Sequence, residues 1–355
     1  MYRQLEIQRF RSFEHVHVEG LRRINLLVGT NNSGKTSLLE AVFLLGGATN
    51  PAFAMSVAQS RGQRLGSATP DPIWRSLFYD LDPSAVIEIE GQWNDETRRR
   101  RLSIEALPIS TYSDLSEPLA AGTGRPDEAP VGGLRLRYRM ARGDEIVTQA
   151  IFDPRTGSIR APSEKRPDFV PTAYLSARSH STLARDTDQF SHLVKAKREA
   201  EVVAALNVID SSIRRLEVVS EGGLSTMYAD VGLPSLAPLA VCGEGTVRLF
   251  SLVVEAAGSR GGVLLVDEID GGLHHSVMDK FWATLREIAD RHDVQIFATT
   301  HNEELVHSAI RAFERDASGT LGLFRLDRRR GRHAVTSYNE AALRAVQGAG
   351  FEVRG

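Results

Sequence analysis

The sequence predicts an α/β fold in which a largely parallel β-sheet is covered by helices on both faces. Three observations support this prediction. Apolar runs of strand length alternate with helix-like segments in the last third of the chain, and Gly29–Thr36 fits the pattern GxxxxGK[ST] between such a run and a helix. In addition, the apolar run Val263–Val266 ends in two carboxylates. Strands joined through helices are the pattern that parallel sheets require.

The composition is that of an ordinary globular protein. At 355 residues the chain exceeds the size at which one core stops growing, so we expect a principal domain with a sub-domain or insertion. Hydrophobic residues make up 42% of the chain and charged residues 25%. A net charge of −2 disfavours a protein that coats nucleic acid by bulk electrostatics, so any DNA contact needs a local patch.

The cysteine content and the N-terminal pattern indicate a reducing compartment. Cys242 is the single cysteine, which excludes an internal disulfide and a cysteine zinc site. The chain begins with strand-like alternation instead of a signal peptide, and no apolar run reaches the roughly 18 residues of a membrane span. We therefore expect a cytoplasmic protein without a membrane anchor.

The pattern of apolar residues predicts the elements one by one. In the first half we expect strands at 2–10, 15–21 and 24–28, helices at 37–45, 51–63 and 71–79, about four strands between 84 and 152 around a loop at 112–133, and a strand at 171–176. In the second half we expect helices at 186–206, 208–216, 243–257, 275–291, 302–313 and 339–347, a hairpin at 216–231, and strands at 262–267, 294–299, 321–326 and 334–338.

A run of four arginines, 98–101, falls within the β-rich stretch. Successive side chains of a strand point to opposite faces, so the run cannot form a one-sided patch. We interpret it as an exposed edge strand guarded by charge, with a phosphate-contacting edge as the alternative. His15 and His17 share one face of their strand and are read as solvated residues.

The GxxxxGK[ST] stretch predicts a phosphate-binding loop. Its glycines turn backbone N–H groups towards a phosphate, and the helix that follows presents its positive N-terminus to the same anion. Lys35 would reach the β- and γ-phosphates, and Thr36 would ligate Mg²⁺. The nucleotide-binding residues expected here are Gly29, Asn31, Asn32, Ser33, Gly34, Lys35, Thr36 and Ser37. The sequence therefore predicts ATP or GTP binding.

The strand that ends in Asp267 and Glu268 predicts the second half of the site. Carboxyl ends of parallel strands face the ligand crevice, so both acids are expected beside the phosphate loop. Asp267 would hold Mg²⁺, and Glu268 would orient and polarise the attacking water.

Two further motifs point to a family. Cys242–Leu249 (CGEGTVRL) lies upstream of Asp267, and His301 ends the strand that follows it. In this order the four elements resemble the Walker A, signature, Walker B and switch histidine of ABC-type ATPases. The GxGxxRL form of the signature, with DEIDGGLH at 267–274, resembles the branch of OLD, RecF and SMC proteins, and most of all OLD-like AAA family ATPases of anti-phage defence.

The resemblance implies the architecture and the remaining site residues. It implies an ABC-type head with a mixed or parallel core sheet, an antiparallel β-subdomain and a helical lobe. The expected parts are an ATPase lobe at 1–180 with a β-rich insertion at about 84–152, a helical lobe at 181–242, and a second ATPase lobe at 243–355. The residues implied at the signature are Gly243, Gly245, Thr246 and Arg248; His301 would sense the γ-phosphate, as a catalytic residue with Glu268 and Lys35.

The chain also departs from the family pattern. Gly243 stands where the signature usually has a serine, so the hydroxyl contact is missing or comes from Thr246. No glutamine before Gln189 can be placed as the Q-loop residue. The acids after His301 are scattered, unlike the metal-binding cluster of a TOPRIM domain, so we expect no nuclease activity from this chain alone.

The signature predicts a dimer. A Gly-Glu-Gly turn opening a helix is an anion site, and it cannot reach the phosphate loop of its own chain if both motifs crown separate strands. A second protomer would supply this anion site, so bound ATP would hold two chains together as a homodimer. The alternative is that the Gly-rich turn is only a helix cap. Two alternative roles also remain open: His301 could be a buried core histidine, and Arg248 could be the partner of an acid. His274 is expected at the dimer interface.

We expect a Mg²⁺-dependent ATPase that switches between dimer states in phage defence or DNA maintenance, with a separate effector protein. A RecF-like DNA-binding repair ATPase is one alternative, and an ATP-binding scaffold with little hydrolysis is another. A transporter subunit fits the signature and the β-rich insertion less well. The absence of a sustained heptad excludes an SMC-like clamp.

Overall fold

The fold is described here from a computed structural model. The structure describes residues 1–47, 50–60, 71–93, 99–108, 130–140, 145–153, 158–160, 170–177, 183–314, 319–329 and 331–338, and all structural statements below concern these ranges. The predicted helix 339–347, most of the loop 112–133, and Arg98 lie outside them.

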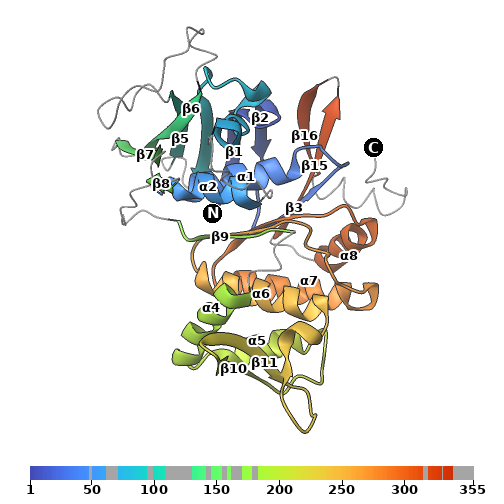
Figure 1. Ribbon diagram of the computed structural model, residues 1–355. Helices are drawn as coiled ribbons and strands as arrows, with labels where there is room; N and C mark the ends of the chain where they lie inside the picture. The colour runs from blue at the N-terminus through green and yellow to red at the C-terminus, as the bar shows by residue number, and fades with distance from the viewer. Residues whose placement is uncertain are drawn as a thin grey trace.

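A six-stranded sheet forms the centre of the molecule (Figure 1). Five of its strands run parallel, and an antiparallel strand closes one edge. In spatial order they are β16 (Arg332–Tyr338), β15 (Leu321–Arg329), β3 (Ile24–Val28), β14 (Gln295–Thr299), β13 (Val263–Val266) and β9 (Thr172–Leu175). The three strands in the middle are buried at every position, which is why they read as unbroken apolar runs.

Alternate residues of the central strands enter two different cores. In β13, Val263 and Leu265 pack into the core on one side of the sheet, and Leu264 and Val266 pack into the core on the other. The first core lies beneath a seven-stranded antiparallel sheet, and the second lies above the long helices of the last third (Figure 1). The central sheet therefore separates two hydrophobic cores, one on each of its faces.

The antiparallel sheet packs over the phosphate-loop helix. Its strands, in spatial order, are β2 (Phe13–Glu19), β1 (Tyr2–Phe10), β4 (Ile87–Trp93), β5 (Arg99–Pro108), β6 (Val131–Met140), β7 (Glu145–Asp153) and β8 (Ser158–Arg160). Alternate residues such as Leu5, Ile7, Ile87 and Ile89 are buried against the helix that begins at Lys35, as period-two alternation predicts.

The helices divide between the two faces of the central sheet. On the side of the antiparallel sheet lie α1 (Lys35–Gly46), α2 (Ala52–Ser60) and α3 (Asp71–Arg75); on the other lie α4 (Leu183–Lys195), α5 (Glu199–Leu206), α6 (Glu244–Gly258), α7 (Met278–Arg291) and α8 (Glu303–Phe313). Helix α8 begins as expected, because the Asn302 side chain accepts a hydrogen bond from the Leu305 N–H.

The segment expected as a helical lobe also contains a small sheet. Its strands are β10 (Arg215–Glu221), β11 (Leu224–Asp230) and β12 (Ala237–Pro238). The hairpin turns at Gly222-Gly223, as predicted. The helix expected at 208–216 is wrong, because the chain turns at 207–209 and again at 211–212 and enters β10 at Arg215. The single helix expected at 186–206 is also wrong: Lys197, with φ 58°, separates α4 from α5.

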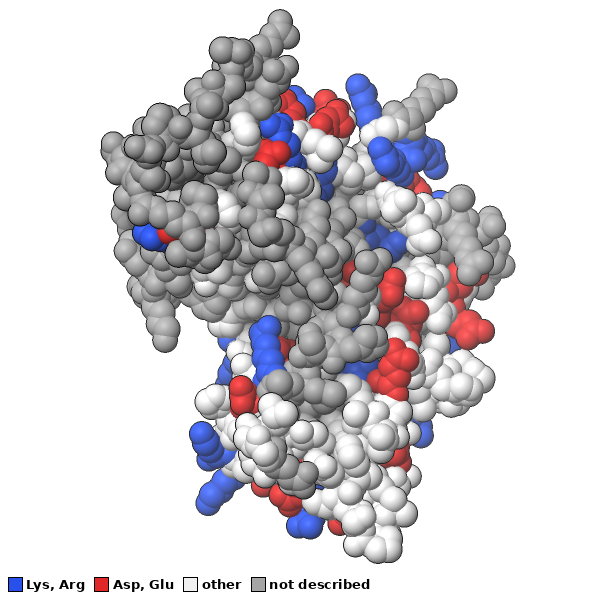
Figure 2. All heavy atoms as spheres, viewed as in Figure 1, with Lys and Arg blue, Asp and Glu red and all other residues white. Residues whose placement is uncertain are grey.

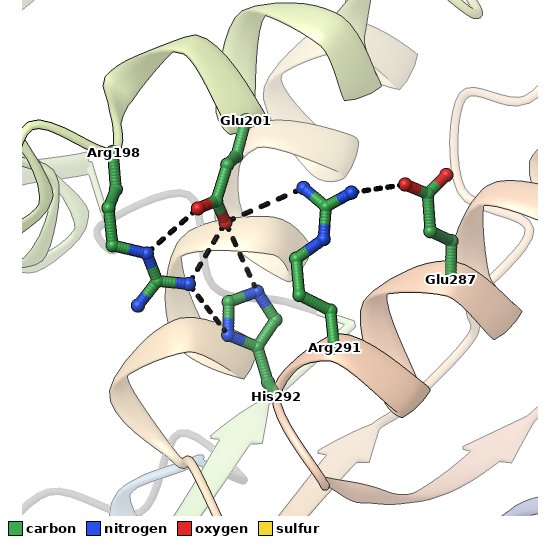
Figure 3. A network of polar contacts seen from close by, with 5 residues as sticks. All are labelled: Arg198, Glu201, Glu287, Arg291 and His292. Atoms are coloured by element: carbon green, nitrogen blue, oxygen red, sulfur yellow. Dashed lines mark hydrogen bonds and ion pairs between the residues drawn. The ribbon is translucent and has the colours of Figure 1, made fainter.

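Polar contacts tie α5 to the end of α7 (Figure 3). Arg198 donates to Glu201 at 2.8 Å, and Arg291 lies 3.7 Å from the second Glu201 oxygen while pairing with Glu287. His292, which is 2% exposed, lies between Arg198 and Glu201. Burial lowers the pKa of His292, so the ring is held neutral.

The arginine run does not form an edge strand. Strand β5 pairs with β4 on one side and β6 on the other, so it is interior to its sheet and the edge-strand interpretation is wrong. Arg101 pairs with Glu88 at 2.6 Å and Arg99 with Glu90 at 3.6 Å, and the Arg100 guanidinium lies 5.3 Å from the Trp93 ring centre. The charges of Arg99 and Arg101 are thus matched by glutamates on β4 and do not protect an edge.

The hairpin of β15 and β16 joins the two sheets. It extends the central sheet at one edge, and β16 also packs against β2. The contact includes Phe13 and His333, whose ring centres lie 4.9 Å apart at 86°. Within the described ranges, no helix combines the length and the apolar character needed to cross a membrane.

Candidate functional site

The phosphate-binding loop occupies the carboxyl end of β3 and has room only for glycine at two positions. Gly29 has φ 139°, and an added Cβ would lie 2.2 Å from the carbonyl oxygen of Leu326 on β15. Gly34 has φ 99°, and an added Cβ would lie 2.4 Å from the Phe13 ring. Both conformations are ones that other residues rarely adopt, so neighbouring strands fix the path of the loop.

Lys35 is held by the carbonyl oxygens of the loop itself. Its Nζ donates to Gly29 O at 2.7 Å and to Thr30 O at 3.0 Å. Burial lowers the pKa of Lys35, while the charges of Asp267 and Glu268 oppose that shift. The ammonium group is thereby placed at the mouth of the loop, pointing across it.

Asp267 is the centre of a hydrogen-bonded cluster. Thr36 Oγ1 lies 3.1 Å and 3.3 Å from its two carboxylate oxygens, and Thr299 Oγ1 donates to one of them at 2.6 Å. These three side chains come from α1, the end of β13 and the end of β14. The cluster thus joins the phosphate loop to the two strands beside it.

Glu268 is exposed and has φ 52°, in the left-handed region. Its backbone N–H donates to Thr299 Oγ1 at 2.8 Å, and the next N–H, of Ile269, donates to Thr299 O at 2.9 Å. A non-glycine residue in this conformation carries strain that its surroundings must support, and such residues concentrate at active sites. Here the support comes from Thr299.

These side chains line one cleft of about 1040 Å³. That volume lies at the upper end of ligand pockets, which are roughly 300 to 1,000 Å³. Residues 31–37 of the phosphate loop form one wall, and Asp267, Glu268, Thr299 and His301 form another. His301 is exposed on this wall, so it is not a buried core histidine. The geometry thus brings together the residues expected from Walker A, Walker B and the switch histidine.

The signature residues do not reach this cleft. Gly243, Gly245, Thr246 and Arg248 are absent from its described lining. Thr246 is 2% exposed, so its hydroxyl does not replace a signature serine on the surface of this chain. Gly243 has φ 106°, a conformation in which a serine would be strained, and this accounts for the glycine.

The signature turn packs against the loop that follows the acidic strand. A Cβ on Gly245 would lie 2.4 Å from the Gly272 carbonyl oxygen. Nearby, His274 is exposed and its ring accepts a hydrogen bond from the Ser276 N–H. Gly243 and Glu244 are exposed at the start of α6, so this end of the helix faces outward.

Arg248 binds main-chain oxygens instead of an acid. Its guanidinium donates to Ser176 O at 3.2 Å and to Asp267 O at 2.5 Å, with Glu268 O at 3.5 Å. Burial lowers its pKa, and the acids around it, Asp267 first among them, counter that shift. In this conformation Arg248 fixes the tips of β9 and β13 and is not directed at the cleft.

No described glutamine takes the Q-loop position. Ser176 and Ala177, at the end of β9, line the cleft. Gln189 lies on α4, where its side chain approaches Gly258 at the far end of α6.

The residues present fit a magnesium nucleotide. Mg²⁺ prefers oxygen ligands and usually combines one or two protein oxygens with phosphate and water, and Thr36 with Asp267 offers such a pair. Ser33 Oγ is buried with no hydrogen-bond partner in the described part of the chain. An unpaired polar atom inside the loop is what a loop shaped for an anion would show.

Sequence reasoning missed several residues of the cleft, among them Thr299, Arg11 and Arg328. Arg11 donates to Glu40 at 3.2 Å and to Ser76 O at 2.7 Å, which ties the β1–β2 turn to α1 and to the residue that follows α3. No motif marks these positions, and the sequence alone does not reveal that β14 and β15 flank the phosphate strand.

Comparisons with known proteins agree with this geometry. A family model described as "AAA domain, putative AbiEii toxin, Type IV TA system" matches residues 24–307. An ATP/GTP phosphatase of Helicobacter pylori is 20% identical over 341 residues, which cover 86% of each chain.

The protein RecF, of DNA replication and repair, is also similar. The RecF of Geobacter sulfurreducens is 33% identical over 156 residues, covering 43% of this chain and 38% of that protein. Among solved structures, an SMC head bound to the C-winged helix domain of ScpA matches with a TM-score of 0.53 and 14% identity, over 95% of this chain and 97% of that one. At that identity the match speaks for the fold alone.

Proposed function

The chain belongs to the AAA domain family whose model matches it, as a P-loop ATPase of the ABC type in the RecF/SMC branch, and from that premise we propose an ATP-gated dimeric switch. In this proposal ATP is bound and hydrolysed in the cleft beside Lys35. The observation that carries it is the meeting of Thr36 and Asp267, 3.1 Å apart, in a cleft that Glu268 and His301 also line.

Each residue of the cleft has a task in the proposed reaction. Lys35 exchanges its loop carbonyls for the β- and γ-phosphates, whose negative charge it offsets. Thr36 and Asp267 hold Mg²⁺, which when bound neutralises charge on the phosphate oxygens. Glu268 orients the attacking water, because an exposed carboxylate in the cleft can accept its proton. His301 contacts the γ-phosphate and reports its presence.

The exposed start of the signature helix is proposed to act on the partner's nucleotide. Gly243 and Glu244 are exposed at the positive end of α6 and lie outside the cleft of their own chain, whereas Thr246 is buried. Val241, just before them, is 72% exposed, and a partner subunit would cover this apolar side chain. Two chains placed head to tail would each complete the other's site, so ATP stabilises the dimer and hydrolysis releases it.

For the biological role we propose phage defence in the cytoplasm together with a separate effector protein. The family description, which names an AbiEii toxin and a type IV toxin–antitoxin system, supports this role. The similarity to RecF supports a second candidate, a DNA-binding repair ATPase. Salt-dependent binding to duplex DNA that stimulates ATP turnover would favour the second.

The test compares ATP turnover in the wild type, Glu268→Gln and Lys35→Ala. Removing a general base should lower turnover about 100-fold or more, while ATP binding remains. We expect Glu268→Gln with ATP to elute as a stable dimer in size-exclusion chromatography with light scattering, and Lys35→Ala to stay monomeric. Glu304→Gln, an exposed glutamate on α8, is the matched control and should behave as wild type.

Two results would count against the proposal. Undiminished turnover in Glu268→Gln would reject the assigned catalytic role. ATP binding without measurable wild-type turnover would leave a scaffold that stores an effector in an ATP-bound form.

A further inference from the structure

Strand β15 runs past the end of the phosphate strand and continues beside the phosphate loop. The pairing of β15 with β3 ends at Arg325 and Val28. The next residue, Leu326, places its carbonyl against Gly29, so the strand residues that follow flank the loop. In the space-filling view Lys and Arg atoms gather over this hairpin, at the upper right (Figure 2). Part of this basic surface thus borders the nucleotide cleft.

Arg328 faces the loop, whereas Arg329 does not. Arg328 lies opposite His333 in the hairpin register, and Arg329 lies opposite Arg332. His333 packs against Phe13, and its ring lies 3.3 Å from the position of a Cβ on Gly34. Cross-strand partners share a face of the hairpin, and successive residues alternate. In agreement, Arg328 lines the cleft with the phosphate loop, and Arg329 is not part of its described lining.

Arg328 has no hydrogen-bond or ion-pair partner among the residues that the structure describes. Arg325 pairs with Asp327 at 3.0 Å, and Arg11 is held by Glu40 and Ser76. Lys35 donates to loop carbonyls. For Arg328 the described residues provide neither a hydrogen bond nor an ion pair, although it is the charged residue of β15 that lines the cleft. A nucleoside triphosphate would bring more negative charge than Lys35 alone can balance.

We propose that Arg328 binds the polyphosphate of the nucleotide held by its own phosphate loop, as a second cation opposite Lys35. Its planar guanidinium can donate two parallel hydrogen bonds to phosphate oxygens, which is the geometry that phosphate recognition favours. Strand β15 therefore contributes to the site although it carries none of the four motifs. The inference rests on the proposed function, because it assumes that ATP occupies the cleft.

The test measures binding of a non-hydrolysable ATP analogue, ADP and adenosine by isothermal titration calorimetry in the presence of Mg²⁺. Arg328→Ala should weaken binding of the ATP analogue by about 10-fold or more, weaken ADP less, and leave adenosine unchanged, because charge-assisted bonds to phosphate are lost. Arg328→Lys should recover part of the loss. Arg329→Ala removes the same charge from the same strand and should stay within 2-fold of wild type.

Several outcomes would overturn the inference. Equal affinities for Arg328→Ala and wild type would do so, and equal losses in Arg328→Ala and Arg329→Ala would show a general effect of surface charge. Normal binding of the analogue with loss of the ATP-dependent dimer would make Arg328 an interface residue. If the wild type bound no nucleotide, the proposed function would fail as well, whereas the other outcomes leave that function intact.

Discussion

Replacing Thr299 tests how Asp267 and Glu268 are held in place in the cleft. Its hydroxyl donates to Asp267 at 2.6 Å and accepts the N–H of Glu268 at 2.8 Å, and the residue is 0% exposed. Thr299→Val keeps the size and branching of the side chain but replaces this hydroxyl with a methyl group. The carboxylate then loses one donor, and the Glu268 N–H loses its acceptor.

The expected cost follows from these two bonds. A hydrogen bond to a charged group contributes about 1.5–3 kcal/mol, and a buried N–H without a partner costs about 1–3 kcal/mol. Asp267 keeps its contact with Thr36, so we expect Thr299→Val to lower the free energy of unfolding by about 3 kcal/mol. We also expect weaker Mg²⁺-dependent ATP turnover, because Glu268 loses the contact that supports its backbone conformation.

Thr299→Ser is the matched control, since it keeps the hydroxyl and loses only a methyl group, at about 1 kcal/mol. Urea unfolding of the nucleotide-free protein gives the stabilities, and a phosphate-release assay gives turnover. We expect Thr299→Ser to keep most of the turnover and Thr299→Val to lose most of it. If the free energies of unfolding of the two variants differ by less than about 0.5 kcal/mol and their turnover is equal, the Thr299 hydroxyl does not hold Asp267 and Glu268 in place.

Two further predictions concern other parts of the fold. Gly245→Ala should lower the free energy of unfolding by about 1–3 kcal/mol, because its Cβ would meet the Gly272 carbonyl, whereas Gly271→Ala, with no contact under 3.5 Å, should stay near wild type in the same urea titration. The pKa of His292 is lowered by burial, so below the ordinary value of about 6.5 the unfolded chain takes up a proton that the folded chain refuses, and stability falls as the pH drops below that value until the lowered pKa is reached. His292→Gln should remove this dependence of stability on pH, measured as urea midpoints from pH 7.5 to 5. The loss of stability that comes from the lowered pKa of Glu201 would remain, below about pH 4.5 (Figure 3). An unchanged dependence on pH above pH 5 would contradict the assignment to His292.

The sequence was most informative where burial is complete. Strands β3, β13 and β14 are buried at every position, so their apolar runs could be read directly, and the phosphate loop between β3 and α1 has a fixed pattern. Asp267 and Glu268 follow such a strand, which predicted that they lie beside the loop. The contact between Thr36 and Asp267 agrees with that placement.

The errors arose where pairing partners decide the outcome. The arginines of β5 suggested an edge strand, but β6 pairs with β5. The residues of the run themselves do not show that a distant segment pairs with them. The break at Lys197 falls among good helix formers, so propensity does not reveal it. Thr299 and Arg328 escaped notice because their importance depends on which strands flank β3, and strand order is a property of the whole fold.

In the proposed dimer, Arg248 would link two surfaces that serve different nucleotides. Arg248 lies on α6, and its guanidinium donates hydrogen bonds to the main-chain oxygens of Ser176 and Asp267. A tilt of the helix would therefore either move the end of β13 or break these bonds. A displacement of α6 by a neighbouring subunit would be transmitted through Arg248 to Asp267, the residue before Glu268. In the proposed dimer, occupation of one pocket would therefore affect the geometry of the other through Arg248.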